Sequence, residues 1–308
     1  MDIKNFVENI NNVSNSMKSE FTEMDVNYKL VIDKINILYP KNNGGNGMLN
    51  CDEWLKEKHQ NGRIHERGLV SFLIALKRNN IYPGRFLDIG AHYGYFTIFF
   101  AKLFSGSKIL AVDINKDSLN SLKNNCLCND IMENVKILPR VISDRDEKNL
   151  KIISGFNQLD FSITKFIYLF FRSIFLSFIN RSRVNFPITT QLRSITMRKL
   201  CEENLFDPDI IKIDVEGFQA KFLSSSMEFL KLHRPIVIVE FDTRETMKKF
   251  NTSNIELSKP IISMNYKFIW GDHRANISKF EFIDSIVDTK NDLEVNSLGI
   301  FMPDELFD

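Results

Sequence analysis

The stretch from Phe86 to Thr97 constrains this chain most, because a short apolar run ends there in an acid and two glycines before a helical pattern begins. The pattern predicts a strand, a tight turn and a helix. Gly90 can adopt a backbone conformation that other residues avoid, and Gly94 lets a ligand approach the main chain. We therefore expect a ligand to lie against this turn.

The acids near the turn indicate which ligand it accepts. A dinucleotide site uses Gly-x-Gly-x-x-Gly and binds a pyrophosphate at the helix N-terminus, whereas this turn reads Gly-x-x-x-Gly with Asp88 two residues before Gly90. Asp88 would repel a phosphate but suits a ligand with an ammonium and a sulfonium group. The next apolar run ends in Asp113, at the spacing of the acid that binds ribose hydroxyls in nucleotide-binding βαβ units. This charge pattern is that of S-adenosylmethionine.

Four sequence motifs follow one another in a specific order. They are Leu-Asp-Ile-Gly-Ala-x-x-Gly-x-x-Thr at 87–97, Asn-Val-Lys-Ile at 134–137 with Ser-Asp at 143–144, Ile-Lys-Ile-Asp-Val-Glu-Gly at 211–217, and Arg-Pro-Ile-Val-Ile-Val-Glu at 234–240. In these motifs the chain resembles the FkbM-type family of S-adenosylmethionine-dependent methyltransferases. The family usually has Asn where His92 stands, and Thr-Leu-Asp-Asp-Leu where this chain has Thr-Met-Arg-Lys-Leu at 196–200.

The resemblance implies a fold, a reaction and a set of cofactor residues. The fold is α/β, the Rossmann-like seven-stranded methyltransferase fold, with antiparallel sixth and seventh strands at 266–270 and 297–302. The reaction is O-methylation of a hydroxyl on a sugar, glycan or natural-product-like small molecule, with S-adenosylmethionine as cofactor. The residues expected to bind the cofactor are Asp88, Gly90, Ala91, Gly94, Thr97, Asp113 and Asp144.

Acids at strand ends are the candidates for chemistry, because ligands of open α/β sheets bind outside the carboxyl ends of the strands. Asp214 is a candidate catalytic base, since the fourth strand, 210–213, ends beside the expected methyl group. His273 is a second candidate. Asp214, Glu240 and Asp242 could together bind Mg²⁺, which prefers oxygen ligands and would acidify an acceptor hydroxyl. Paired acids at strand ends also occur without a metal.

Three other functions compete with this interpretation. An NAD-dependent oxidoreductase shares the strand, turn and ribose acid, but Asp88 and the missing middle glycine argue against it. A nucleic-acid base methyltransferase would carry Asn/Asp-Pro-Pro-aromatic where this chain has Asp-Val-Glu at 214–216, and a net charge of +1 gives no field that attracts nucleic acid. A non-catalytic cofactor-binding scaffold is left open by the basic pair Arg198 and Lys199.

Two further regions precede the expected catalytic domain, 85–308. Residues 1–45 are predicted to form a helical arm, because apolar residues from Phe6 to Leu38 recur at steps of four and three, as in a coiled coil. Such an arm would form a homodimer through residues 1–40, or lie on its own domain as an amphipathic helix. Residues 46–84 are predicted to form a helical cap. Glu66 stands where the family often has a Glu and could face the cofactor, but we expect it to be a solvated charge near a helix start.

An apolar, basic insert is expected at about 154–190 of the catalytic domain. From Phe161 to Lys199 the chain has seven basic residues and no acid. The insert would be a lid that excludes water from the acceptor, or a helix at 161–183 in peripheral contact with an anionic membrane. The N-terminus lacks the apolar core of a secretory signal. We therefore expect a cytoplasmic protein, with membrane contact only in the second case.

Overall fold

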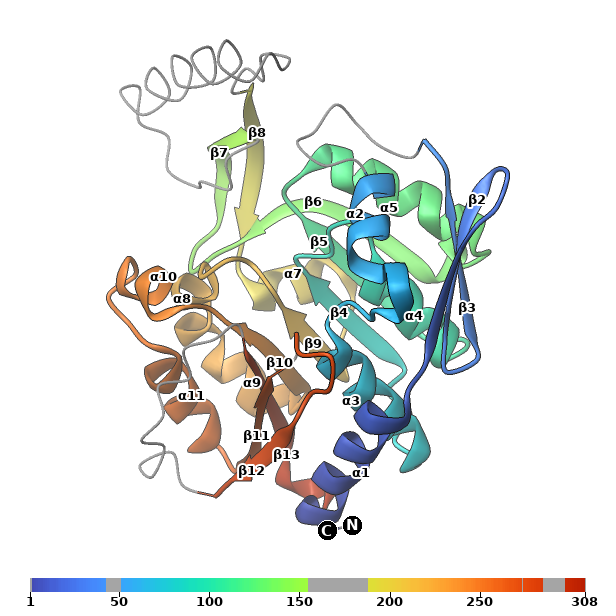
Figure 1. Cartoon of the computed structure of the whole chain (residues 1–308). Coiled ribbons are helices and arrows are strands. Elements are labelled where there is room, and N and C mark those ends of the chain that lie inside the picture. The colour runs from blue at the N-terminus through green and yellow to red at the C-terminus, as the bar shows by residue number, and fades with distance from the viewer. Residues whose placement is uncertain (1, 43–50, 155–187, 273, 285–296, 308) are drawn as a thin grey trace.

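A large mixed sheet forms the centre of the protein (Figure 1). The computed structural model describes residues 2–42, 51–154, 188–272, 274–284 and 297–307. In chain order, the strands of this sheet are β4 (Arg85–Ile89), β5 (Lys108–Asp113), β6 (Val135–Ile142), β7 (Glu147–Ser154), β8 (Ile188–Ile195), β9 (Ile210–Ile213), β10 (Ile236–Phe241), β11 (Tyr266–Asp272), β12 (Phe280–Ile283) and β13 (Ser297–Pro303). Among the described residues these ten strands have the spatial order β12-β11-β13-β10-β9-β4-β5-β6-β8-β7.

The middle of the sheet confirms the predicted Rossmann-like fold. Strands β6, β5, β4, β9 and β10 are neighbours in this order and run parallel. β13 is antiparallel to β10 on one side and to β11 on the other. β11 therefore runs in the same direction as the parallel strands. The predicted antiparallel pair of final strands, 266–270 and 297–302, is confirmed, because β13 pairs antiparallel with β11.

Helices cover both faces of the sheet (Figure 1). On one face, the hydrophobic core contains Phe86, Ile109 and Ile210, which pack with residues of α3 (Arg67–Arg78), α4 (Tyr95–Leu103) and α5 (Lys116–Cys128). The other core contains their strand neighbours Leu87 and Leu110. Its helices are α7 (Met197–Asn204), α8 (Gln219–Phe222), α9 (Met227–His233), α10 (Arg244–Lys248) and α11 (Asn254–Ile262). Burial on both faces explains the nearly continuous apolar runs of the parallel strands.

Pro139 interrupts β6, and its position agrees with the prediction that this strand behaves as an edge. β6 pairs with β5 over Val135–Pro139, but with β8 only from Arg140 onward. Pro139 thus lies before the second ladder begins, where the missing N–H costs no hydrogen bond to β8. Strands β7 and β8 pair antiparallel beyond it. The predicted insert between these two strands falls outside the described residues, so the lid and the membrane helix both stay predictions.

The N-terminal region differs from the predicted helical arm. A helix, α1 (Ile3–Ser16), is followed by a three-stranded antiparallel sheet of β1 (Ser19–Glu23), β2 (Asn27–Ile32) and β3 (Ile35–Pro40). Alternate residues of β2 are buried, which is the period of a strand. Asp33 and Lys34 join β2 to β3 with φ of 45° and 73°, as a tight hairpin turn requires. The predicted heptad pattern was wrong because apolar residues spaced by two also produce steps of four.

α1 packs against its own chain, where Phe6 and Ile10 are fully buried. Its main neighbours are α3 and β12. The Asn11 side chain exchanges two hydrogen bonds with the backbone of Phe280, and Ser14 Oγ accepts one from the Ser278 amide at 2.9 Å. Several side chains that were expected to form a dimer seam, among them Phe6, Ile10 and Tyr28, therefore belong to the core of one chain. The predicted coiled coil is wrong, while the homodimer itself stays a prediction.

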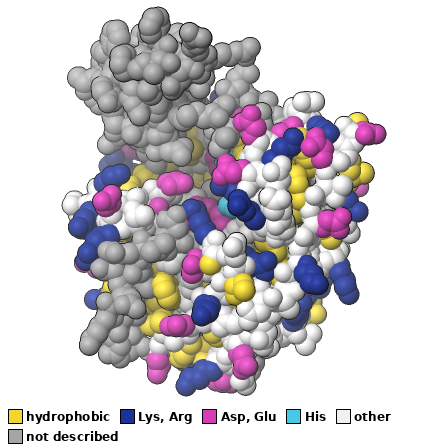
Figure 2. Space-filling view, viewed as in Figure 1, with side chains coloured by type: hydrophobic (Ala, Val, Ile, Leu, Met, Phe, Trp, Pro, Cys, Tyr) yellow, Lys and Arg dark blue, Asp and Glu magenta, His cyan; other side chains and the backbone are white. Residues whose placement is uncertain are grey.

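A helical segment, which we call the cap, precedes β4 within the described residues. It consists of α2 (Cys51–His59), the 3₁₀ turn η1 (Gln60–Gly62) and α3, which lead into β4. Further 3₁₀ turns are η2 (Met132–Asn134), η3 (Ser224–Ser226) and η5 (Asp304–Leu306). Across the described ranges, every helix is too short or too polar to cross a bilayer. Figure 2 shows acidic and basic side chains interspersed over one face, as the near-neutral composition leads one to expect.

Candidate active site

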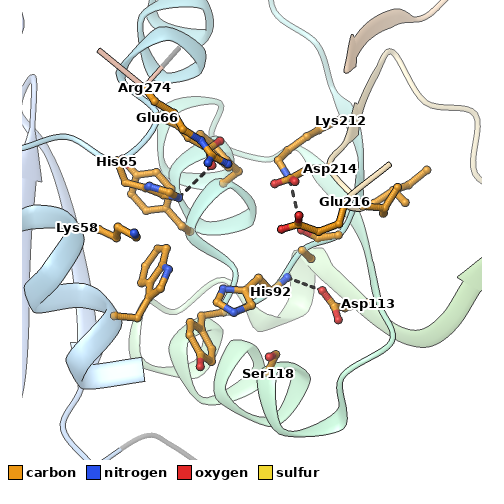
Figure 3. A pocket seen from close by; sticks show the side chains of 18 of the residues that line it. Lys58, His65, Glu66, His92, Asp113, Ser118, Lys212, Asp214, Glu216 and Arg274 are labelled. Atoms are coloured by element: carbon orange, nitrogen blue, oxygen red, sulfur yellow. Dashed lines mark hydrogen bonds and ion pairs between the residues drawn. The ribbon is translucent and has the colours of Figure 1, made fainter. Parts of the chain in front are cut away.

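A pocket of about 900 Å³ opens at the carboxyl ends of β4, β5 and β9 (Figure 3). The strand ends and the loops after them form its floor and one wall, and the cap forms the opposite wall. Residues 274–276, which follow β11, complete the rim. The pocket thus lies where ligands of open α/β sheets bind, and the cap encloses it.

The turn after β4 is held tightly, and its two glycines serve packing as well as ligand approach. Gly90 has φ of +82°, and a Cβ placed there would lie 1.8 Å from the carbonyl oxygen of Asp214. Gly94 has φ of +81°, and its Cβ would lie 2.0 Å from Leu122 Cδ1 of α5. Gly90 and Ala91 line the pocket as predicted. Gly94 does not line it, so the structure corrects its predicted role: it makes room for α5.

Asp113 lies in the pocket wall at the end of β5. Its Oδ2 accepts a hydrogen bond from the His92 amide and its Oδ1 accepts one from the Asn115 amide, both at 2.8 Å. These bonds fix the orientation of the carboxylate (Figure 3). Each carboxylate oxygen has a second lone pair and can accept another hydrogen bond. Asp113 is therefore arranged to bind a ligand that carries two neighbouring hydroxyls.

Asp88 and Thr97 are fully buried and do not line the pocket. Thr97 Oγ1 donates a hydrogen bond to Asp88 Oδ2 at 2.7 Å, and Lys212 Nζ lies 3.5 Å from Asp88 Oδ1. Burial raises the pKa of Asp88, while Lys212 and Thr97 oppose that rise. In the structure, Asp88 and Thr97 thus bind each other and Lys212 behind the pocket lining, whereas the prediction had both contact the cofactor.

Lys212 connects the buried acid with the pocket, which the sequence analysis missed. Its side chain is only 4% exposed, and Nζ lies 3.1 Å from Asp214 Oδ2 and 3.3 Å from the carbonyl oxygen of Gly90. The ammonium also lies 5.5 Å from the centre of the Phe96 ring. Burial alone would lower the pKa of Lys212, but Asp214 and Asp88 raise it well above its ordinary value. A charged residue inside the apolar run of β9 was the available signal, because a buried charge requires a partner.

Asp214 faces the pocket directly after β9, and its environment makes it a weak base. Burial would raise its pKa, but Lys212 holds the pKa below the ordinary value of an aspartate. The neighbouring Glu240 behaves in the opposite way: burial and the negative charge of Asp214 raise its pKa. Arg274 forms an ion pair with Glu240 on its other side. Asp214 and Glu240 are therefore already paired within the protein.

The predicted Mg²⁺ site on Asp214, Glu240 and Asp242 does not agree with these contacts. Asp242 Oδ2 accepts a hydrogen bond from Gln219 Nε2 at 2.7 Å, while Asp214 is paired with Lys212 and Glu240 with Arg274. Within the described ranges, groups of three histidines, cysteines or acids that could hold a metal ion are absent. The three acids follow neighbouring strands, as predicted, but their carboxylates bind protein donors.

One other predicted residue, Asp144, does not reach this pocket in the structure. Asp144 is exposed, accepts a hydrogen bond from Ser143 Oγ at 2.9 Å and does not line the pocket. In place of Asp144, its upstream neighbours Arg140, Val141 and Ile142 form that part of the wall. His273 falls outside the described residues, so its predicted catalytic role stays a prediction.

A histidine of the cap was also missed, and the glutamate beside it has the position that was expected less. Glu66 is 5% exposed and has a left-handed backbone, φ 47° and ψ 54°, immediately before α3. Its Oε1 lies 3.0 Å from His65 Nε2, and both side chains line the pocket (Figure 3). The rings of Trp54 and Tyr95 lie 5.0 and 5.5 Å from the His65 ring. Glu66 is thus not the solvated charge that was expected, and a strained backbone of this kind often marks a functional site.

Comparisons with known proteins give one family match and several similar solved structures. The methyltransferase FkbM domain family matches residues 88–286. Among solved structures, a methyltransferase FkbM from Methylobacillus flagellatus is 11% identical, with a TM-score of 0.43, and the match covers 71% of this chain and 43% of that chain. An O-methyltransferase from Bacillus cereus, in complex with SAH, is 13% identical, with a TM-score of 0.35 and coverage of 75% and 78%. A search of curated proteins gave no significant match.

Proposed function

The chain belongs to the FkbM methyltransferase family, and from this premise we propose that it transfers the methyl group of S-adenosylmethionine to a hydroxyl of a sugar, glycan or similar small molecule. The observation that carries the proposal is the fixed carboxylate of Asp113 in a pocket beside the Gly90 turn. Bound there, the cofactor would supply an activated methyl group. The residues of the chain would bind the cofactor and the acceptor, align them and exclude water.

The pocket has groups that suit the parts of this cofactor. The free lone pairs of Asp113 suit the two ribose hydroxyls. Ile114, Val141 and Ile142 add apolar surface on the same side, which suits the adenine ring. The Gly90 turn passes between this side and the acids that face the pocket from β9 and the cap. The pocket therefore offers an apolar surface for adenine, a hydrogen-bond acceptor for the ribose hydroxyls and, beyond the Gly90 turn, negative charge for the sulfonium, which is the order of these groups along the cofactor.

The acceptor side is formed by the cap. Removal of a proton from an acceptor hydroxyl needs a base within hydrogen-bond reach. Asp214 is poorly suited, because Lys212 lies 3.1 Å from its carboxylate and lowers its pKa. His65 fits the task better, since Glu66 holds one ring nitrogen at 3.0 Å and leaves the other to accept a proton. A carboxylate that orients a histidine is the arrangement that known hydrolases use to fix the tautomer of their base.

The test is mass spectrometry of mixed small hydroxylated compounds and glycans incubated with the protein and deuteromethyl-labelled S-adenosylmethionine. We expect one class of compound to gain the labelled methyl group on oxygen. His65→Gln should reduce the rate by roughly a hundredfold or more, the usual contribution of a general base, while cofactor affinity is retained. A labelled product methylated on nitrogen or carbon would contradict O-methylation. Tight cofactor binding without any product would favour the non-catalytic scaffold.

A further inference from the structure

We propose that Asp214 is the residue by which this site distinguishes the positively charged methyl donor from its neutral demethylated product. Asp88 makes this possible, because its buried carboxylate also pairs with Lys212. The inference rests on the proposed function and deepens it. It assigns a selectivity role to a buried row of charges at the pocket floor, formed by Asp88, Lys212 and Asp214.

The row has one cation between two acids. Lys212 Nζ lies 3.5 Å from Asp88 Oδ1 and 3.1 Å from Asp214 Oδ2. Asp88 is fully buried, whereas the Asp214 side chain is 23% exposed and lines the pocket. Were Asp88 apolar, Lys212 would cancel the charge of Asp214. Because Asp88 shares the ammonium, the row has one net negative charge, and its outward end is the Asp214 carboxylate.

The position of Asp214 relative to Asp113 fits the length of the cofactor. Asp113 ends β5, and Asp214 directly follows β9, with only β4 between these two strands. Two strand spacings correspond to about 10 Å. A ligand whose ribose binds Asp113 would cross the Gly90 turn and place the groups beyond the ribose near Asp214. The sulfonium of the methyl donor is the first charged group on that path.

Other acids near the floor differ from Asp214 in their surroundings. Glu66 lies against His65, and Glu240 lies against Arg274 and Asp214. Glu216 also lines the pocket, but burial and the charge of Asp214 raise its pKa. A cation that enters the pocket therefore meets Asp214 as a pocket-facing carboxylate of a row with excess negative charge. Attraction between opposite charges is strong in such a place, because the cap and the strand ends limit screening by water.

The experiment is calorimetric titration with three ligands. S-adenosylmethionine has a sulfonium, sinefungin has an amine cation in its place, and S-adenosylhomocysteine has an uncharged thioether. Asp214→Asn, which keeps the side-chain shape, should weaken binding of both cations by about tenfold, or about 1.4 kcal/mol. Binding of the thioether should change by less than about twofold.

Two control variants separate this effect from other losses. Asp113→Asn should weaken all three ligands by the same factor, because all three share the ribose. Asp130→Asn removes the same charge from an exposed site outside the pocket and should leave all three affinities unchanged. Equal weakening of cations and thioether in Asp214→Asn, or no weakening of either, would overturn the inference while the proposed function stands. A wild-type protein that binds none of the three would overturn the proposed function itself.

Discussion

Asp88 of β4 and Lys212 of β9 are direct partners in the register of two neighbouring parallel strands, and their side chains form an ion pair beneath the pocket. Both side chains are almost completely buried. The pair therefore joins the two central strands at the point where the Gly90 turn leaves the sheet. It links the stability of the core to the geometry of the site.

This pair should show strong coupling in a double-mutant cycle. Lys212→Met leaves Asp88 as an uncompensated buried charge and should reduce the free energy of unfolding by about 3–5 kcal/mol. Asp88→Asn in the same chain should recover part of that loss, because it removes the unpaired charge. Urea denaturation of the wild type, both single variants and the double variant measures the coupling. Strictly additive losses would show that the two charges do not interact.

The Gly90 turn should tolerate no side chain, for two separable reasons. Gly90→Ala requires a left-handed backbone and places Cβ 1.8 Å from the Asp214 carbonyl oxygen. Gly106→Ala is a matched control, because Gly106 has φ of +84° and nothing within 4 Å of its Cβ position. The control should lose about 1–2 kcal/mol of unfolding free energy from backbone strain. Gly90→Ala should lose at least about 1–3 kcal/mol more through overpacking.

Thermal unfolding of the two glycine variants, with cofactor titration of each, checks this difference. Gly106→Ala should keep cofactor affinity, since the residue is remote from the pocket lining. Gly90→Ala should lose it, because the turn and Asp214 must move apart. Equal stability of the two variants would mean that the close approach of Gly90 to β9 is not a constraint.

His59 should make the protein less stable in mild acid. Burial, and then the neighbouring His65, lower the pKa of His59 from 6.5 to about 3. The unfolded chain therefore binds a proton between these values that the folded chain excludes. The free energy of unfolding should fall as the pH drops below about 6.5, by up to ~1.4 kcal/mol per pH unit. His59→Gln should flatten this dependence in urea titrations between pH 7 and 4, and an unchanged slope would contradict it.

The sequence predicted the parallel core well, because its motifs combine the apolar runs of buried strands, the glycines of a tight turn and the acids at the strand ends. Asp113 and the Gly90 turn lie where they were expected. The role of Asp88 was misassigned, since its chemistry depends on Lys212, a residue 124 positions later that becomes its partner only through strand pairing. Local pattern cannot show which side of a strand faces a ligand and which side faces a buried partner.

The N-terminal region and the cap show two other limits. Steps of three and four among apolar residues fit a coiled coil, yet the Asp33-Lys34 turn and the alternation in β2 produced a hairpin. Packing of β3 against α4 and α5 favoured the strand period of two residues over the helical period. Glu66 was expected to be solvated, because acids near a helix start are common. Its burial beside His65 follows from the way the cap folds over the sheet, which no local signal records.

The most direct test of the account is calorimetric binding of S-adenosylmethionine and NAD to the wild type, Asp113→Ala and Asp144→Ala. The account predicts that the wild type binds S-adenosylmethionine and not NAD. Asp113→Ala should lose at least about tenfold in affinity, since it removes hydrogen bonds from a charged group to the ribose. Asp144→Ala should bind as the wild type does, because Asp144 is exposed outside the pocket. Tight NAD binding, or undiminished S-adenosylmethionine binding by Asp113→Ala, would contradict the central claim.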